Sequence, residues 1–538
     1  MAEAKKYTLA ELSVNNIDSF IFSSIKTQQL LIKNEKVNQV FEKVLLFCQK
    51  ELSLTQQEKP GKDESWYILV EEKLGTLKLL LPTKELAQKV LGYISLWGIE
   101  ECPGLELNGT TVPCAWTTAN VSQAIQTSQT MLRDKRFEDA RPSRAIWPFA
   151  VIASAYGMSA VERTDDGQYI GTVDLVTHDQ AFDAKTSADL KALDQALRSA
   201  DSFNKVMSKD TKLVLEDNLE GLAQKSPSKK IALVRLSASN LPSLATALAK
   251  DAKKDATTLI SAQVKLHQAA QKATDQAIVA GLRAAIIQDL QGTKFEGPVY
   301  KLPMEMCVHQ GADLLFFMRS DRVFRFVDAF TASYESQMKE AGHPSSLCIG
   351  MVIMQSKYPM SRALKLSEQL LASSQAAAQK SEQLKSWIDY VVLTNDIEQN
   401  IELLRKNSYT ATDGGLLTGK PYVCGCTRQR MSETYIPNAS LADIVADAKL
   451  LSRLLPISSL RRAIDECHAG TAYAKRAWEK MYSDLKLKES TRKTILPSFE
   501  RIFSTNFFIE RKGARPYTLL GDYLEVRHLF SPDEDEEA

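Results

Sequence analysis

The stretch from Met304 to Phe317, MEMCVHQGADLLFF, is the sequence feature that most constrains the fold of this chain. Two apolar runs flank a short segment, Gln310–Asp313, that contains a glycine and ends in an aspartate. Apolar runs separated by a short glycine-containing turn are typical of a β-hairpin, because glycine adopts the left-handed backbone that tight turns need. We therefore predict a hairpin here, with both strands buried in a sheet.

The length of the chain, 538 residues, exceeds what one hydrophobic core supports and predicts about three or four domains. The 67 basic and 66 acidic side chains nearly cancel, so net charge gives no reason to expect a polyanionic partner, although a local basic groove remains open. No window approaches the ~18 consecutive apolar residues of a membrane span, and the N-terminal segment lacks a signal-peptide core. We expect a cytoplasmic protein without membrane contact.

The hairpin belongs to a longer βαββαβ pattern. A short apolar strand precedes an alanine-rich stretch with helical spacing, and an amphipathic helix and another buried strand follow the hairpin. The expected elements are a strand at Ile231–Leu236, a helical stretch from Leu241 to about Leu290, the hairpin, a helix at Arg322–Ala341 and a strand at Leu347–Ile353. A further helix, Met360–Gln379, and a strand, Ile388–Leu393, are expected to close the sheet.

A fainter copy of the same pattern precedes it. The expected strands are Tyr7–Leu12, Trp66–Glu71, Leu77–Leu81 and Gly109–Trp116, and the expected helices contain Val37–Leu45 and Lys84–Trp97. The region between the copies, from about Asn120 to Lys225, shows no clear periodicity. Beyond about Ser440 the spacing is helical again, up to a short acidic tail.

Several segments, taken in order, resemble one known family. They are Asn15–Ser24, Ile231–Leu241, His309–Phe317, Ser346–Gln375, Leu417–Tyr422 (LTGKPY) and Leu455–Ile464. Together they resemble the large polymerase/cyclase-like subunit of type III CRISPR effector complexes, as a stand-alone and catalytically degenerate relative. That family carries two palm domains, the second with a Gly-Gly-Asp-Asp hairpin.

The resemblance implies an α+β fold with two ferredoxin-like palm (βαββαβ) domains, an intervening region and a C-terminal helical domain. The expected boundaries are 1–120 for the first palm-like domain, 121–225 for the intervening region and 226–400 for the second palm-like domain with its degenerate GGDD hairpin. Residues 401–530 are expected to form the helical domain and 531–538 the acidic tail.

The resemblance also locates a site. In active palms of this family, acids from the first strand and the hairpin tip hold two divalent cations that align a nucleotide triphosphate. Carried onto this chain, these acids fall on Ser237, Ser239 and Ala312, and only Asp313 remains. A serine hydroxyl is neutral and alanine offers no oxygen, so we expect no catalytic residue and no metal site. A remnant of the nucleotide pocket is expected at Ser237, Ser239, Asn240, Gln310, Gly311, Ala312 and Asp313.

The leading functional hypothesis is a non-catalytic scaffold or nucleotide sensor in a CRISPR-type antiviral assembly. It needs no cofactor, and its partners would be effector subunits or other proteins, with RNA as a further candidate. One alternative is an active nucleotidyl cyclase or oligonucleotide synthase, in which Asp313 shares Mg²⁺ with Asp389, Asp396 or a partner's acids and uses ATP or GTP. Another is a purely structural protein-interaction module. An enzyme is the less favoured reading.

Other motifs in the sequence support no separate chemistry. Gly414–Lys420 fits G-x-x-x-x-G-K, but Pro421 follows where a phosphate-binding loop needs Ser or Thr, so we do not predict one. The eight cysteines are scattered, and we expect Cys307 and Cys348 to be buried thiols. The close pair Cys424 and Cys426 is weak evidence for a metal. A basic helical region with aromatic residues runs from about residue 461 to 493. We interpret it as a solvated surface rather than as a groove for RNA.

Overall fold

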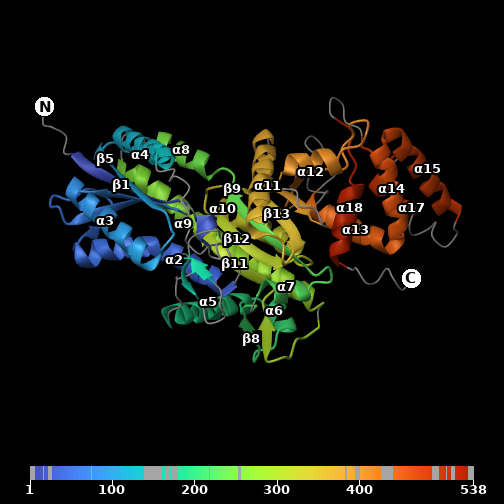
Figure 1. Cartoon of the computed structure of the whole chain (residues 1–538), viewed down its shortest axis with the longest axis horizontal. Helices are drawn as coiled ribbons and strands as arrows, with labels where there is room; N and C mark the ends of the chain where they lie inside the picture. The colour runs from blue at the N-terminus through green and yellow to red at the C-terminus, as the bar shows by residue number, and fades with distance from the viewer. Residues whose placement is uncertain are drawn as a thin grey trace.

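The structure, a computed structural model, describes residues 6–15, 17–21, 27–73, 75–138, 160–163, 169–171, 180–216, 218–251, 256–291, 293–381, 384–393, 400–425, 440–487, 496–503, 506–509 and 515–530. One mixed α/β unit lies at the N-terminal end, a second lies in the middle, and helices form the C-terminal end (Figure 1). This arrangement confirms the predicted α+β class with tandem palm-like domains and a helical C-terminal region. Among the described residues no helix is long and apolar enough to cross a membrane.

The first palm is a ferredoxin-like unit. Its strands are β1 (Lys6–Val14), β2 (Thr55–Gln56), β3 (Trp66–Lys73), β4 (Thr76–Leu81) and β5 (Leu107–Ala115). Its main helices are α2 (Thr27–Leu46), followed by the π-helical turn η1 (Phe47–Glu51), and α3 (Lys84–Glu101), while the short α1 (Ile17–Ile21) follows β1. The sheet order β2-β3-β4-β1-β5 places β1 between β4 and β5, antiparallel to both. The fainter of the two sequence copies therefore folds as the clearer one does.

The second palm repeats this order on a larger sheet. Its βαββαβ elements are β9 (Lys230–Ala238), α9 (Ala256–Asp289), β11 (Met304–Gln310), β12 (Asp313–Arg319), α10 (Val323–Glu340) and β13 (Leu347–Gln355). The chain then continues through α11 (Met360–Lys380) to β14 (Trp387–Val392) and β15 (Tyr422–Val423). The sheet order is β11-β12-β9-β13-β14-β15, and the predicted hairpin is the antiparallel pair β11–β12.

The long helical stretch expected from Leu241 is described as two helices. The shorter α8 (Leu241–Asp251) precedes α9, and residues 252–255 between them lie outside the described part. At ~1.5 Å per residue, the 34 residues of α9 extend about 50 Å. Leu259 and Ile260 near its N-terminus pack in one cluster with Trp66 of the first palm. Leu282, in its second half, packs with Phe326 of the second palm, so α9 bridges the two units.

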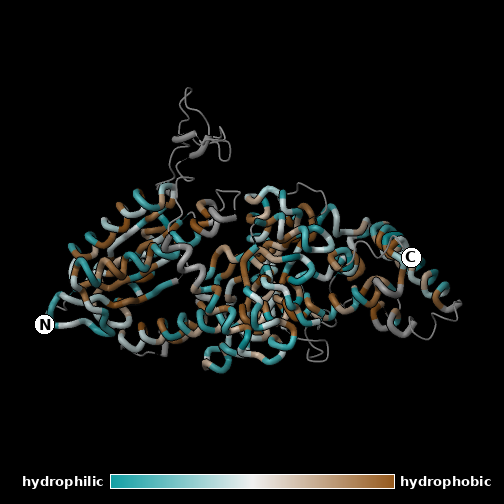
Figure 2. Tube along the Cα trace, turned by 90° about the horizontal axis from the view of Figure 1, so that it is seen from below, coloured by the Kyte–Doolittle hydropathy of each residue, from teal (hydrophilic) through white to brown (hydrophobic). Residues whose placement is uncertain are grey.

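The two palms also share a hydrophobic core. One cluster of buried side chains contains Leu12 and Val40 from the first palm and Phe317 and Val352 from the second. The opposite face of the second sheet is covered by α9 and α10. Figure 2 shows the resulting alternation of hydrophobic and hydrophilic positions along the helices that cover these sheets. Each sheet is therefore buried on both faces, as its apolar strands predict.

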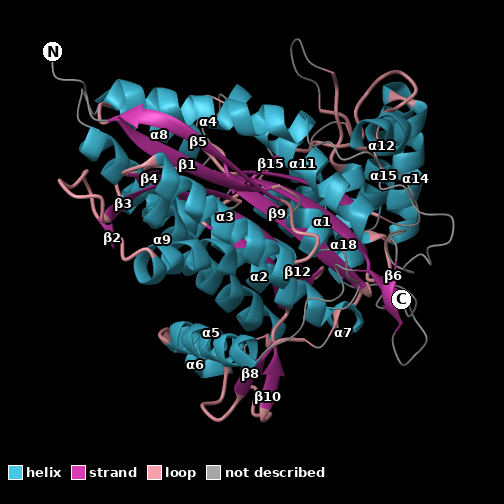
Figure 3. Cartoon of the chain, turned by 60° about the vertical axis from the view of Figure 1, so that its left-hand side comes forward, coloured by secondary structure: helices cyan, strands magenta, loops and turns pink. Residues whose placement is uncertain are grey.

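The region between the palms contributes several small elements. The helix α4 (Thr118–Glu138) packs on β1 and β5 of the first palm. The remaining elements of this region are β6 (Ala160–Arg163), β7 (Tyr169–Gly171), α5 (Gln180–Arg198), α6 (Asp201–Val206), β8 (Lys212–Val214) and α7 (Leu219–Gln224). The strand β10 (Val299–Lys301) comes later in the chain, between α9 and β11. Strands β8 and β10 form a parallel pair that lies with α5 and α6 apart from the two main sheets (Figure 3).

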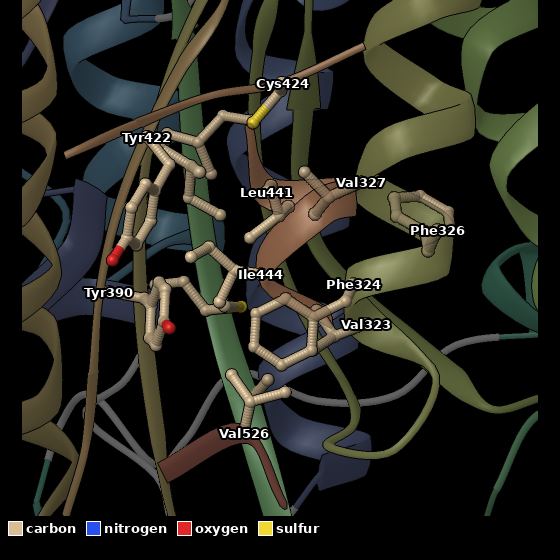
Figure 4. Packing of buried hydrophobic residues seen from close by; sticks show 14 of the residues in the cluster. Val323, Phe324, Phe326, Val327, Tyr390, Tyr422, Cys424, Leu441, Ile444 and Val526 are labelled. Carbon is tan, nitrogen blue, oxygen red and sulfur yellow. The ribbon is translucent and has the colours of Figure 1, made fainter. Parts of the chain in front are cut away.

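Helices dominate the C-terminal region. They are α12 (Ile401–Ser408), α13 (Leu441–Leu454), α14 (Ile457–Ala469), α15 (Thr471–Leu487), α17 (Leu496–Phe503) and α18 (Leu520–Phe530). Leu441 and Ile444 of α13 and Val526 of α18 lie beside Phe324 of α10 and Tyr390 of β14 (Figure 4). This contact joins the helical region to the second palm in one core. The predicted acidic tail lies outside the described residues.

Candidate functional site

The hairpin turn lies at one end of the second sheet. Gln310 and Asp313 pair across it, so Gly311 and Ala312 form a two-residue turn. Gly311 has a φ of +62°, the left-handed conformation that side chains disfavour. A Cβ atom on Gly311 would meet nothing within 4 Å, so the turn is open on that side. Ala312, where the family carries an acid, is buried in the core instead.

Helix α9 fastens this turn. The Gly311 backbone N–H donates to the side-chain Oε1 of Gln271 on α9. The Gln271 Nε2 atom lies 3.0 Å from His309 Nε2 and 3.0 Å from Asp275 Oδ1. His309 Nε2 itself lies 3.1 Å from Asp275 Oδ1. A backbone N–H that could have faced a ligand is therefore used inside the protein, a contact that the sequence did not predict.

The end of β9 is tied to the start of β13 by a polar cluster, which we call the serine clasp: Ser239, Asn240, Ser345 and Ser346. The Ser239 hydroxyl lies 2.7 Å from the Ser346 hydroxyl, and the Ser239 N–H donates to the Ser346 carbonyl at 2.9 Å. Asn240 Oδ1 accepts from the Ser345 hydroxyl at 2.8 Å and from the Ser346 N–H at 3.3 Å. Asn240 Nδ2 donates to the Pro344 carbonyl at 3.0 Å. These groups already satisfy one another.

Asp313 begins β12 beside the end of β9. The pair Leu314–Leu236 is the last in the register, so the next position places Asp313 next to Ser237, at ~5 Å between strands. Burial raises the pKa of Tyr334 on α10 to about 12, and the nearby Asp313 charge adds to the shift. The structure thus gathers the predicted residues Ser237, Ser239, Asn240 and 310–313 at one sheet end.

The donors at this sheet end do not fit a pair of magnesium ions. Two Mg²⁺ ions need several oxygen ligands, carboxylates above all, in octahedral arrangement. Of the positions that the resemblance aligns with metal-binding acids, Asp313 keeps a carboxylate, while the Ser239 hydroxyl is bonded within the serine clasp and Ala312 has no side-chain oxygen. The nearby Asp275 carboxylate accepts from Gln271 Nε2 and lies beside His309. Among the described residues, no group of three or more His, Cys, Asp or Glu side chains could share a metal ion.

Asp389, one of the acids that the cyclase alternative could use, does not converge with Asp313. Asp389 lies on β14, three strands away from β12, which corresponds to ~14 Å across the sheet. Its buried carboxylate accepts from the Arg405 guanidinium on α12. Asp396 lies outside the described residues. The sequence could not reveal this separation, because both acids lie in strands of the same sheet and the order of strands in a sheet is not written in the residue order.

The segment LTGKPY forms a buried charge network rather than a phosphate loop. Lys420 Nζ lies 2.5 Å from Glu525 Oε2 and 3.3 Å from Asp522 Oδ1, both on α18. The same nitrogen lies 4.0 Å from the centre of the Tyr390 ring. Burial alone would lower the pKa of Lys420, but the two carboxylates raise it. The Lys420 ammonium group therefore links α18 of the helical region to Tyr390 of β14 and has its partners within the protein. Sequence spacing could not pair residues about a hundred positions apart.

The cysteine and basic-region predictions have clear outcomes. Cys307 and Cys348 are buried free thiols, as predicted, and Cys424 is buried while Cys426 lies outside the described residues.

The basic helices α14 and α15 enclose a groove of about 410 Å³. Acidic Glu466 and Asp484 line it together with its basic side chains, the mixture expected of a solvated surface.

The chain was compared with curated proteins and with solved structures. No curated protein matches the sequence. A solved Csm1-Csm4 cassette in complex with cA3 shares 11% identity, with 98% of this chain and 70% of that chain covered and a TM-score of 0.49. A Csm1-Csm4 cassette with cA4 shares 12% identity, with 73% and 55% covered and a TM-score of 0.43. Csm1 of T. onnurineus shares 13% identity, with 72% and 54% covered and a TM-score of 0.40. This chain spans about half the length of the last two.

A family model matches one part of the chain. The matched residues, 230–384, run from β9 to the segment before β14 and include the hairpin and the serine clasp. The model describes the second palm domain of Cas10/Cmr2. Residues 230–384 of this chain therefore match the Cas10/Cmr2 second palm domain, and the resemblance inferred from the ordered motifs is confirmed over this segment.

Proposed function

We propose that this chain is a non-catalytic tandem-palm scaffold of a type III CRISPR-type antiviral assembly. The observation that carries the proposal is the serine clasp at the sheet end where the resemblance places metal-binding acids. Its hydroxyl and amide groups bond to one another, and α9 holds the neighbouring turn through Gln271. A palm whose sheet end is held by these hydrogen bonds presents rigid sheet edges and helices on which partner proteins can dock. At the positions of the metal-binding acids it retains one carboxylate, that of Asp313.

Nucleotide sensing at the same sheet end is the second form of this proposal. Gly311 leaves open space beside the turn, and Asp313 stands at its edge. A nucleobase could rest there without metal, since base recognition uses hydrogen bonds and stacking rather than cations. The scaffold form has more support, because the side chains of the serine clasp already have hydrogen-bond partners.

The first test separates the scaffold from the cyclase alternative. The purified chain is incubated with radiolabelled ATP or GTP and Mg²⁺ or Mn²⁺, and the products are resolved by chromatography. We expect no oligonucleotide or cyclic product. A metal-dependent product that disappears in Asp313→Asn but persists in Asp389→Asn would establish the cyclase and overturn the proposal.

The second test concerns the partners. A tagged chain is recovered from its native host, and the bound proteins and nucleic acids are identified. Recovery of CRISPR effector subunits with repeat-containing RNA supports the scaffold in an effector. Recovery of a protein partner without effector subunits or RNA would instead favour the plain interaction module.

A further inference from the structure

A cavity of about 680 Å³ lies between the second palm and the C-terminal helices. Its walls come from the start of β9, the end of β14, α12, α14 and α18. The nine residues of β9 separate it from the hairpin turn by ~30 Å, because the turn lies at the other end of that strand. The cavity is therefore distinct from the predicted palm site, and nothing inferred above assigns it a role.

Cationic side chains from separate elements line this cavity. Lys229 comes from the turn before β9, Lys230 from the first position of β9 and Arg461 from α14, and the His528 imidazole of α18 lies among them. Within the described residues, neither the Lys229 ammonium nor the Arg461 guanidinium has a hydrogen-bond or ion-pair partner in the protein. Both side chains are exposed, so each can turn towards an anion that enters the cavity, and cations on one rim raise the local concentration of anions.

The backbone at Lys229 supports a role for its side chain. Lys229 has a φ of +51°, a left-handed conformation that is unfavourable for a non-glycine residue. Its N–H donates to the Ser226 carbonyl at 2.9 Å, which fixes the turn. Glycine or asparagine would adopt the left-handed backbone of this turn at a lower conformational free-energy cost than lysine does. The lysine is therefore not explained by the turn itself.

The remaining polar lining does not cancel this charge. Glu525 is the acid of the described lining, and its carboxylate is engaged by Lys420 Nζ at 2.5 Å and by the Tyr409 hydroxyl. Lys230 Nζ donates to the Leu393 carbonyl at 2.9 Å, which holds it at the cavity edge. The hydroxyls of Ser228 and Ser408 add donors for an oxyanion.

The rest of the wall is apolar. Val391, Val392, Leu404 and Leu524 provide a surface against which a flat ring can pack. The volume falls within the ~300–1,000 Å³ of cavities that hold small molecules. Cations beside an apolar wall match a compact molecule with a phosphate group on one side and a ring on the other.

We propose that this cavity binds a nucleoside monophosphate, with the phosphate between Lys229 and Arg461 and the ring on the apolar wall. The site lies between the second palm and the helical region, so an occupant would contact both. This proposal does not rest on the scaffold function, and it requires neither magnesium nor the hairpin turn.

The test is calorimetric titration of the full chain with AMP in EDTA. We expect AMP to bind and adenosine to bind at least about tenfold more weakly, because adenosine lacks the phosphate that forms charge-assisted hydrogen bonds with Lys229 and Arg461. Arg461→Ala and Lys229→Gly should each weaken AMP binding about tenfold. Lys229→Gly also relieves the left-handed backbone, so its melting temperature should not fall, and weaker binding could not be ascribed to unfolding.

The matched control is Arg462→Ala. Arg461 and Arg462 are both exposed and adjacent on α14, but Arg462 lines the separate groove against α15. We expect it to bind AMP as the unaltered chain does, and Asp313→Asn likewise. The proposal is overturned by absent AMP binding, by equal affinity for adenosine, by unchanged affinity in both Arg461→Ala and Lys229→Gly, or by equal loss in Arg462→Ala.

Discussion

At the scale of single residues, buried charges differ in whether they have partners. Lys78 is fully buried on β4, but it forms ion pairs with Glu71 of β3 and Glu11 of β1. Glu305 on β11 is also buried, and one of its carboxylate oxygens has no hydrogen-bond partner. Burial and the charge of nearby Glu216 raise the pKa of Glu305 to about 8. A buried charge without a partner destabilises the fold, whereas in a buried pair each charge offsets the desolvation cost of the other.

Glu305 makes stability depend on pH. Its pKa rises from 4.5 in the unfolded chain to about 8 in the folded one, so the folded state binds the proton more tightly. The carboxyl is neutral in both states below about pH 4.5, and ionisation then destabilises the fold increasingly up to about pH 8. Glu305→Gln should raise the melting temperature at pH 8 and leave it unchanged near pH 5.

The size of this effect and its control follow from the same argument. The gain at pH 8 should be on the order of a few kcal/mol, at about 1.4 kcal/mol per pKa unit. Glu296→Gln serves as the control, because Glu296 is exposed and pairs only with exposed Lys294 in the described structure. An equal gain at both pH values, or an equal gain from the control, would contradict the role assigned to Glu305.

Lys78 gives the opposite prediction. Lys78→Met leaves Glu11 and Glu71 without their cation, and breaking a buried pair in this way costs about 3–5 kcal/mol. Hydrogen exchange of the β1 and β4 amides should therefore accelerate strongly. Adding Glu11→Gln should recover part of the loss, whereas Lys294→Met, at an exposed ion pair, should change little. Unchanged β1 and β4 exchange in Lys78→Met would refute the pairing.

At the scale of elements, the backbone of α11 comes very close to the second sheet at one glycine, Gly350. A Cβ atom added to Gly350 of β13 would lie 2.3 Å from the Ser367 carbonyl and 2.5 Å from the Leu371 nitrogen. Both atoms belong to the backbone of α11, so they cannot move without moving the helix. The apolar run LCIGMVI thus contains one position where size rather than hydrophobicity is decisive.

Gly350→Ala should displace α11 and destabilise the chain by at least about 2 kcal/mol, because overpacking a core costs roughly 1–3 kcal/mol and a backbone clash lies at the upper end. Gly92→Ala is the matched control, since a Cβ there meets nothing within 4 Å in the middle of α3. The control should stabilise the chain by about 0.5–1 kcal/mol. Thermal melting of both variants checks the pair, and equal effects would refute the packing argument.

At the scale of the whole molecule, the palms are joined by α9 and by a shared core. Side chains of both palms meet in one cluster, and α9 packs on β3 of the first and α10 of the second. Units that share this much buried surface do not behave as independent domains. The serine clasp and the turn fastened by Gln271 lie within this joined body.

Calorimetry tests the joining directly. The described palms should unfold in one transition, and Gly350→Ala, although it lies in the second palm, should lower the melting of the first as well. Hydrogen exchange of β4 in the first palm provides the local readout. Faster exchange confined to the second palm would show that the shared core does not couple them.

The sequence determined the elements because each signal was local. The apolar runs around Gly311, the Gly-His-Pro stop after α10 and Pro359 before α11 act within a few residues, and the structure has elements where they predict them. The replacements at Ser237, Ser239 and Ala312 were visible in the same way.

Only the tertiary structure decided what the side chains do. The serine clasp, the hold of Gln271 on the turn, the pairing of Lys420 with α18 and the separation of Asp389 from Asp313 join residues that are distant along the chain. The cavity between Lys229 and Arg461 likewise exists only because α14 packs beside the start of β9. Such contacts depend on how the surfaces of helices and sheets pack against one another. The order of residues along the chain does not state which distant residues come close in space.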